Sequence, residues 1–221
     1  DWSSDVCSSD LTKPYTPKEN VTYHHCENEA ALLTQFLSDW RGKGDYPDIV
    51  TGWNVQFFDM PYLVNRVSRV LDESSMLKFS PLGRIAQRTV TLHGRDQQVV
   101  DIRGIAILDY LELYKKFTYT QQESYRLDHI AHVELGKRKL SYDEYRSLAK
   151  LYRENHQKFI DYNIQDVELV DELDQKLKLI ELVCALAYSA KANYVDTFRQ
   201  VRLWDIMIYH YLDRKSTRLN S

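Results

Sequence analysis

Long apolar runs and paired cysteines are missing from this sequence. No stretch is apolar for long enough to cross a bilayer, and the chain does not open with the charged and then apolar segment of a secretory leader. The three cysteines, Cys7, Cys26 and Cys184, are scattered and odd in number, so they give neither a disulfide framework nor a metal-type spacing. We therefore expect a cytoplasmic protein with no membrane partner and with reduced cysteines.

A surplus of basic residues is missing as well. The chain carries 29 Lys and Arg against 32 Asp and Glu, for a formal net charge of -3. Stand-alone nucleic-acid binders usually show a basic footprint, so this balance argues against that class. A metal-dependent nuclease escapes the argument in part, because its site must be acidic to hold cations that then meet the phosphate. The charge balance therefore leaves nucleases open.

Internal repeats and low-complexity linkers are also missing. The 221 residues are 43% hydrophobic and 28% charged. This length and composition suit one domain with a substantial core.

Residues 51–62 (TGWNVQFFDMPY) are the central segment of the chain. The apolar, β-branched run before them, residues 48–51, predicts a buried strand, and the apolar residues after them repeat at helical spacing. Gly52 allows a close backbone approach, and Pro61 suits the first turn of a helix. The stretch is therefore a strand-to-helix corner.

Asp59 in this corner has two interpretations. A carboxylate at this point can simply cap the new helix, which is the common role of such residues. Asn54 and Phe58, however, place a polar group and an aromatic platform at the same strand end, where open α/β sheets hold their ligands. The proximity of Asn54 and Phe58 favours a functional role for Asp59.

Four further elements are expected around this corner. Residues 21–24 predict a short strand, and Asn28 can cap a helix with one apolar face. Residues 85–92 and 97–102 read as a β-hairpin with a four-residue loop, which four arginines make locally basic. Residues 105–108 predict a second buried strand.

The C-terminal half predicts helices. Asn155 can cap a long helix on which Tyr162 and Asp166, four residues apart, project from the same face. They continue in a stripe with Leu169 and Leu173, and a carboxylate in such a stripe is costly to bury unless it is paired or holds a metal. A Tyr-x-x-x-Asp pair alone is a poor signal, because about one is expected by chance in a chain with 16 tyrosines.

The sequences around Asp59 and Asp166 resemble those of a known family. Residues 52–59 (GWNVQFFD) are similar to the second exonuclease motif, Asn-x-x-x-Phe-Asp, of family B DNA polymerases, and residues 162–166 (YNIQD) to the third, Tyr-x-x-x-Asp. The similarity extends over about residues 15–212 and is closest to polymerases of T-even-like bacteriophages. It implies an α/β domain with a ribonuclease H-like fold, a β-hairpin insertion and a helical C-terminal half.

The resemblance also implies a chemistry. Family members are 3′→5′ proofreading exonucleases that use two divalent cations, Mg²⁺ or Mn²⁺, held by four carboxylates. It implies that Asp59 and Asp166 are metal ligands and that Tyr162 orients the attacking water. These three residues are the expected catalytic set.

Further expectations concern the DNA and the partners. Asn54 and Phe58 would contact single-stranded DNA or the frayed 3′ end of a primer, and Lys139 would neutralise the scissile phosphate; a solvated lysine is an equal alternative. Residues 85–102 are the counterpart of a hairpin that helps to part primer from template. The polymerase domain of the same full-length chain and a sliding clamp are the candidate protein partners, in the host cytoplasm if a phage encodes the chain.

One departure matters more than the matches. The family's first exonuclease motif, Asp-x-Glu, precedes the second, and nothing between Tyr15 and Thr51 supplies it. We expect residues 12–212 to be an exonuclease-domain fragment without its first-motif strand, inactive as it stands. Residues 1–11 and 213–221 look like non-native tails. The alternatives are a stand-alone exonuclease and a catalytically silent domain that binds DNA or acts as a scaffold.

Overall fold

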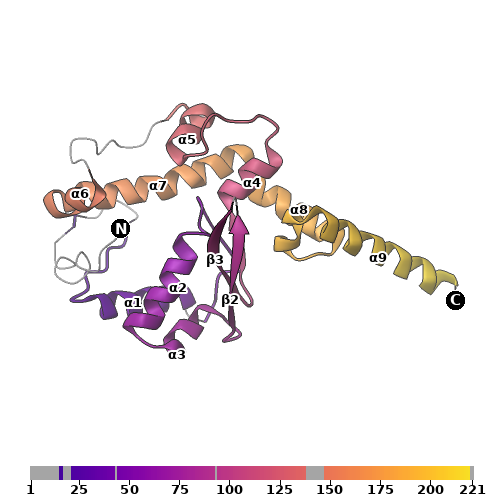
Figure 1. Cartoon of the computed structure of the whole chain (residues 1–221), viewed down its shortest axis with the longest axis horizontal. Helices are drawn as coiled ribbons and strands as arrows, with labels where there is room; N and C mark the ends of the chain where they lie inside the picture. The colour runs from indigo at the N-terminus through magenta and orange to yellow at the C-terminus, as the bar shows by residue number, and fades with distance from the viewer. Residues whose placement is uncertain (1–14, 17–20, 43, 93, 138–146, 220–221) are drawn as a thin grey trace.

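The computed structural model describes residues 15–16, 21–42, 44–92, 94–137 and 147–219. They form a mixed α/β structure with a helical C-terminal half, as the sequence predicts (Figure 1). The first half contains, in order, α1 (Glu29–Arg41), β1 (Ile49–Gly52), α2 (Asp59–Val70), α3 (Glu73–Met76), η2 (Leu77–Phe79), β2 (Ile85–Leu92), β3 (Arg95–Ile102) and β4 (Ala106–Asp109). The second half contains α4 (Tyr110–Phe117), α5 (Leu127–Leu135), α6 (Leu148–Glu154), α7 (His156–Leu177), α8 (Leu179–Ala190), η4 (Tyr194–Phe198) and α9 (Gln200–Leu219).

Strands β1 and β4 pair in parallel and define the site. Their register runs from Ile49 opposite Ala106 to Gly52 opposite Asp109, so both strands end at the same level. Their carboxyl ends, and the turns that follow them, therefore meet at one edge of the pair. In the described part of the chain this pair is a sheet of two strands, and β1 is half-buried rather than buried.

The two faces of β4 pack against different cores. Side chains alternate along a strand, so Ile107 and Leu108 point to opposite sides. Ile107 belongs to a cluster made with α1, α2 and β3: Leu33, Leu37, Val55, Met60, Val64, Val67, Phe79, Val100, Ile102, Ile105 and Ile107. Leu108 belongs to a second cluster made with α4, α5, α7 and α8: Leu108, Tyr110, Leu113, Tyr114, Leu127, Ile130, Ala131, Leu169, Val170, Leu173, Leu179 and Val183. The strand pair thus lies between two helical layers.

The predicted hairpin forms, with a shorter loop. Strands β2 and β3 pair antiparallel from Ile85 opposite Ile102 to Leu92 opposite Arg95. The second strand begins at Arg95 and not at Gln97, so the predicted four-residue loop is wrong. Gly94 has φ of 74° in the turn, and a left-handed residue there allows a tighter connection.

Local capping rules account for several helix starts. The Asn28 side chain accepts a hydrogen bond from the backbone N–H of Ala31 at the start of α1, and Asn155 does the same with Lys158 at the start of α7. Both caps were predicted. The predicted strand at residues 21–24 is wrong, because those residues pair with no strand among the described residues and lie in irregular structure.

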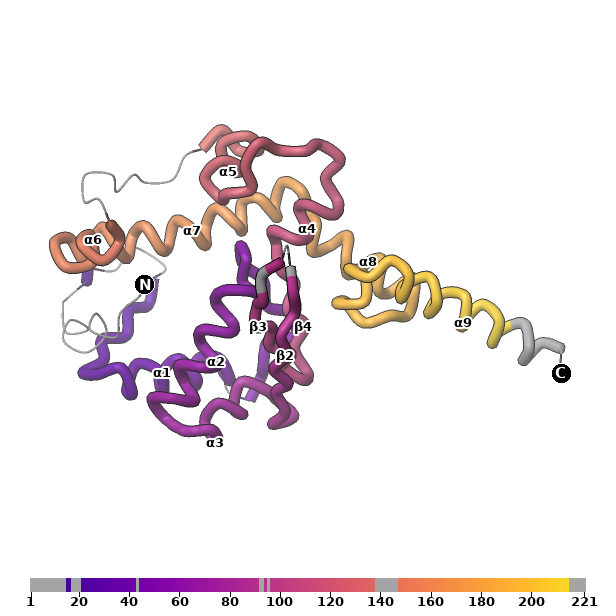
Figure 2. The backbone as a smooth tube through the Cα atoms, in the orientation of Figure 1, coloured from indigo at the N-terminus to yellow at the C-terminus, as the bar shows by residue number. Residues whose placement is uncertain are grey.

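Helix α9 extends away from the layered part of the molecule (Figure 2). Helix α9 exposes a series of large apolar side chains: Val201, Trp204, Met207, Ile208, Tyr209, Tyr211 and Leu212. Among the helices of the described residues, none is long and apolar enough to span a membrane.

Candidate functional site

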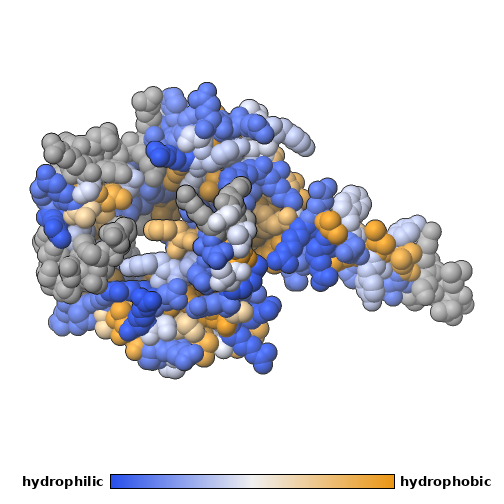
Figure 3. Space-filling view, viewed as in Figure 1, coloured by the Kyte–Doolittle hydropathy of each residue, from blue (hydrophilic) through white to orange (hydrophobic). Residues whose placement is uncertain are grey.

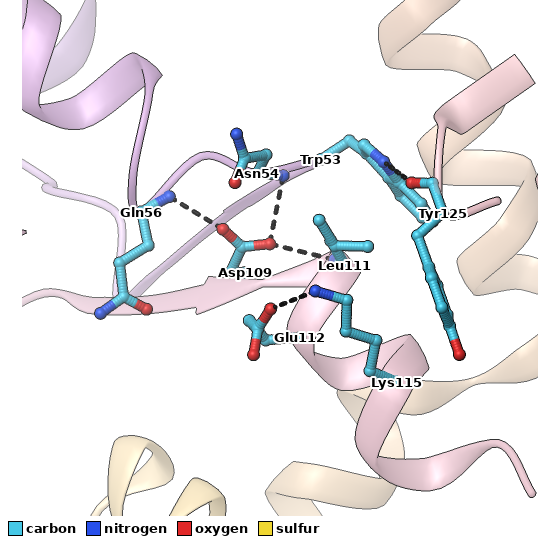
Figure 4. Close-up of polar contacts among 8 residues, drawn as sticks. All are labelled: Trp53, Asn54, Gln56, Asp109, Leu111, Glu112, Lys115 and Tyr125. Carbon is cyan, nitrogen blue, oxygen red and sulfur yellow. Dashed lines mark hydrogen bonds and ion pairs between the residues drawn. The ribbon is translucent and has the colours of Figure 1, made fainter. Parts of the chain in front are cut away.

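The strand-end corner, residues 52–59, joins β1 to α2 and carries three of the predicted site residues. Its backbone is fixed by the carboxylate of Asp109, at the end of β4 (Figure 4). Asp109 accepts hydrogen bonds from the backbone N–H of Asn54 at 3.1 Å and of Gln56 at 3.0 Å. The same carboxylate caps α4 by accepting the N–H of Leu111 at 3.0 Å. One buried side chain therefore ties the corner to the next strand and helix.

The corner turns sharply at Asn54. This residue has φ of 66°, a left-handed conformation that residues other than glycine adopt uncommonly. Its carbonyl oxygen accepts the N–H of Phe58 at 3.1 Å, and the carbonyl of Val55 accepts the N–H of Met60 at 3.0 Å. A continuous series of hydrogen bonds therefore connects Asp109 to the first turn of α2.

Asp59 is the first residue of α2 and its side chain is exposed. The N-cap position is Phe58, which makes no side-chain capping bond. Among the backbone groups of the described residues, the carboxylate of Asp59 contacts only its own N–H. The capping interpretation of Asp59 is therefore wrong. Desolvation raises the pKa of the Asp59 carboxyl, its own N–H opposes the rise, and the negative charge of Asp109 adds to it.

The aromatic residues of the corner divide into an anchor and a platform. Trp53 is held in place, since its indole N–H donates to the carbonyl oxygen of Tyr125 at 3.1 Å and its ring packs near Tyr110 and Tyr114. Phe58 is 59% exposed. An exposed ring next to a fixed turn is available to stack on a planar ligand.

Tyr162 and Asp166 lie on α7, a turn apart. Tyr162 is buried, Asp166 is half-buried, and Leu169 and Leu173 further along the same stripe are buried in the core beside β4 and α4. This stripe therefore forms a packing face of α7. Ile160, Ile164 and Val167 form a second apolar stripe on this helix, and Val167 is 71% exposed.

The N-terminal segment also meets α7. The Tyr15 hydroxyl donates to a carboxylate oxygen of Asp161 at 3.2 Å, and the backbone of Thr16 exchanges two hydrogen bonds with the Gln157 side chain, both at 3.1 Å. These contacts join positions more than 140 residues apart in the sequence. They contact the helix at Gln157 and at Asp161, which directly precedes Tyr162.

The surface between these parts is hollowed. Seen from the side used for Figure 1, a depression separates the α7 layer from the layer of α1 and α2, and apolar side chains show inside it (Figure 3). Helix α2 begins at the carboxyl end of β1, and α7 packs on the opposite face of the strand pair.

The described residues include no group of three or more His, Cys, Asp or Glu side chains arranged to hold a metal ion. What the corner offers a cation is the hard oxygen ligand of Asp59, exposed and next to the negative charge of Asp109. That donor type and that charge suit Mg²⁺ or Mn²⁺. Lys139, the expected phosphate contact, lies outside the described residues.

Asp109 is the site residue that sequence reasoning missed. It is fully buried, and burial raises the pKa of its carboxyl, while the N–H groups of Gln56, Asn54 and Leu111 oppose that rise. The available signal was an acidic residue directly after a predicted buried strand and before a helix. The pairing of β4 with β1, which brings Asp109 to the corner, had no signal in the sequence.

Comparisons with known proteins identify a family. Residues 4–130 match the family described as DNA polymerase family B, exonuclease domain. The chain is 37% identical over 206 residues to the DNA-directed DNA polymerase of Enterobacteria phage T4 and 36% identical over 198 residues to that of Escherichia phage RB69. It is 28% identical over 220 residues to the DNA polymerase catalytic subunit of human herpesvirus 8.

These relatives are much longer proteins. The matches cover 93% and 90% of this chain for the two phage polymerases and 89% for the herpesvirus subunit. They cover only 22%, 22% and 21% of those relatives, so the chain spans about a fifth of their length.

Proposed function

Because the chain belongs to the exonuclease domain of family B DNA polymerases, we propose that it contributes a 3′→5′ proofreading exonuclease site to a DNA-directed DNA polymerase. The substrate is a single-stranded 3′ end or the frayed end of a primer, and the reaction is phosphodiester hydrolysis. The rest of the polymerase is the first partner, a sliding clamp is a second, and the host cytoplasm is the place of action if a phage encodes the chain.

The observation that carries the proposal is the strand-end corner. Parallel strands bring Gly52 and Asp109 to one level, and the turn after β1 presents Asn54, Phe58 and Asp59 beside that edge. Ligand sites of open α/β sheets lie at the carboxyl ends of strands. The geometry therefore supports a ligand site at the motif that resembles the family's second exonuclease motif.

We assign roles to the residues as follows. Asp59 and Asp166 hold two divalent cations, Mg²⁺ or Mn²⁺, which when bound supply an activated water and stabilise the leaving 3′ oxygen. Tyr162 donates a hydrogen bond that orients the attacking water. Asn54 and Phe58 hold the frayed 3′ end, Phe58 by stacking on a base, for which its exposed ring is suited. Lys139 neutralises the scissile phosphate.

The proposed architecture is a ribonuclease H-like domain fragment at residues 12–212, with 1–11 and 213–221 as non-native tails. The β2–β3 hairpin is the insertion that helps to part primer from template. Its basic residues support that role, since Arg84 and Arg88 are exposed on it. No Asp-x-Glu occurs between Tyr15 and Thr51, so the chain alone has half of the metal ligands and is inactive. No observation favours the alternative of a catalytically silent domain.

A graft tests the function. Residues 12–212 would replace the matching segment of the T4 phage polymerase, which restores the upstream and downstream parts. We expect this chimera to digest 5′-labelled single-stranded DNA in Mg²⁺, and we expect Asp59→Ala or Asp166→Ala to reduce the rate by about a thousandfold or more because each removes a metal ligand.

Primer extension by the same chimera reports its folding. A chimera that extends primers but does not degrade single strands contradicts the proposed function. The 221-residue chain is assayed in parallel, and Mg²⁺-dependent digestion that Asp166→Ala abolishes would contradict its proposed inactivity.

A further inference from the structure

The carboxylate of Asp109 is fully buried and faces backbone donors from two parts of the chain. Its Oδ1 accepts the N–H groups of Asn54 and Leu111, and its Oδ2 accepts the N–H of Gln56, at 3.0 to 3.1 Å. Both oxygens are therefore committed to the protein backbone. A carboxylate used in this way holds a structure together and is not available as a ligand for a cation.

Asp59, its acidic neighbour, differs in each of these respects. The side chain of Asp59 is exposed, and in the part of the chain that the structure describes it contacts only its own N–H among backbone groups. The negative charge of Asp109 reaches it and favours a positive ion beside it. The two carboxylates at this strand edge thus have separate roles, one buried and structural, the other exposed and free to bind.

The hydrogen bonds that begin at Asp109 end at the residues that would touch DNA. From Asn54, held at its N–H by Asp109, the carbonyl oxygen holds the N–H of Phe58, and Phe58 directly precedes Asp59. The left-handed conformation of Asn54 is uncommon for a residue with a side chain and persists only where its surroundings impose it. Asp109 supplies that constraint from another strand.

We propose that Asp109 is a positioning residue of the exonuclease site, whose buried carboxylate sets the conformation of the strand-end corner and so places Asn54, Phe58 and Asp59 for a single-stranded 3′ end. This inference rests on the proposed function. Nothing in the resemblance to the polymerase family assigns a role to this residue. It acts through the turn and does not touch the DNA.

Amide hydrogen exchange, resolved by residue with NMR, tests the positioning directly on the 221-residue chain. Asp109→Asn keeps one acceptor oxygen, and the N–H groups of Asn54 and Leu111 can still bond to it. These two N–H groups are therefore expected to stay protected, while the N–H of Gln56 loses its acceptor and should exchange at least about tenfold faster. Asp109→Ala frees all three. Asp72→Ala is the matched control, because Asp72 caps α3 by the same kind of bond, to the N–H of Ser75 at 2.6 Å. It should leave the corner unchanged.

Binding of fluorescein-labelled oligo(dT) in Mg²⁺, followed by anisotropy, links the corner to the ligand. Asp109→Asn is expected to weaken binding about tenfold. The double variant with Phe58→Ala should weaken binding by less than the two single effects combined, since part of the effect of Asp109→Asn acts through Phe58. Asp72→Ala should bind as the wild-type chain does. Binding that Asp109→Asn leaves unchanged overturns the positioning role.

The two proposals fail in different ways. A T4 chimera that extends primers but does not degrade single strands contradicts the proposed function, whatever the exchange pattern of the 221-residue chain. A wild-type 221-residue chain whose Gln56 N–H exchanges as fast as in an unstructured loop overturns the inference about Asp109. The second measurement needs no variant and decides the matter even if substitutions at Asp109 prevent folding.

Discussion

The strand-end corner and helix α7 carry the two motifs of the site, and they are positioned by different means. Helix α7 places Tyr162 and Asp166 on one face through its own repeat, and the same face buries Leu169 and Leu173. The corner contains no such repeat. It depends on Asp109, which reaches it from a strand more than 50 residues further along the chain.

A motif can thus be made of neighbouring residues while the contacts that fix its conformation come from a distant part of the chain. A motif on a helix brings its geometry with it, because residues four apart always share a face. The conformation of a motif on a turn depends on the groups that form hydrogen bonds with the backbone N–H and C=O groups of that turn. The two halves of this site should therefore respond differently to substitution.

The largest effect is expected on the packing face of α7. Leu173→Ala removes a fully buried side chain from the core and should reduce the free energy of unfolding by about 3 kcal/mol, whereas Val167→Ala, 71% exposed on the same helix, should change it by less than about 0.5 kcal/mol. Urea denaturation of the 221-residue chain measures both. Equal effects would mean that α7 packs by its other stripe.

A somewhat smaller effect is expected at the corner. Asp109→Ala leaves three partly buried N–H groups without their acceptor but also removes a desolvated carboxylate, so we expect a loss of about 2 kcal/mol in the free energy of unfolding. Glu168→Ala, an exposed carboxylate on α7, is the control and should stay within about 0.5 kcal/mol of the wild-type value. A loss at Asp109 no larger than at Glu168 would remove the distinction between the two regions.

The cap of α7 tests how local that helix is. Asn155→Ala removes the side chain that accepts the N–H of Lys158 and should reduce the free energy of unfolding by about 1 kcal/mol. Asn155→Asp preserves the acceptor and should recover most of the loss. If aspartate recovers nothing, the start of α7 is set by tertiary contacts and not by its cap.

The smallest effect concerns pH, at the helix that follows Asp109. Burial raises the pKa of the Tyr114 phenol above its ordinary value of 10.0, and the hydrogen bond it donates to Glu134 at 2.7 Å raises it further. The folded state thus favours the protonated phenol, so its contribution to stability is fully present below pH 10 and is lost as the pH rises above 10. Wild-type chain should lose more stability than Tyr114→Phe between pH 9 and pH 11.

Urea midpoints across that range provide the measurement. Tyr110, which is also buried with a raised pKa, remains in both proteins, so the difference between them isolates Tyr114. Parallel pH profiles would contradict the assignment.

Much of the fold followed from local patterns. The apolar runs predicted β1, β4 and the hairpin strands, and Asn28 and Asn155 predicted the starts of α1 and α7. The two wrong predictions of strand bounds both depend on strand pairing, which composition does not show. Residues 21–24 have a strand-like composition but pair with no described strand. Arg95 and Asp96, predicted as loop, pair with Leu92 and Thr91 and so shorten the hairpin loop.

Local sequence patterns were enough to identify the family, the two motifs and the helical face shared by Tyr162 and Asp166, because short motifs and a repeat of 3.6 residues are properties of neighbouring residues. The folded structure was needed to find that β4 lies beside β1, that Asp109 is buried under the corner and that Asp59 is exposed and does not cap its helix. Those outcomes depend on which distant groups satisfy the backbone N–H groups of a turn. Such pairings form between residues that no local pattern connects.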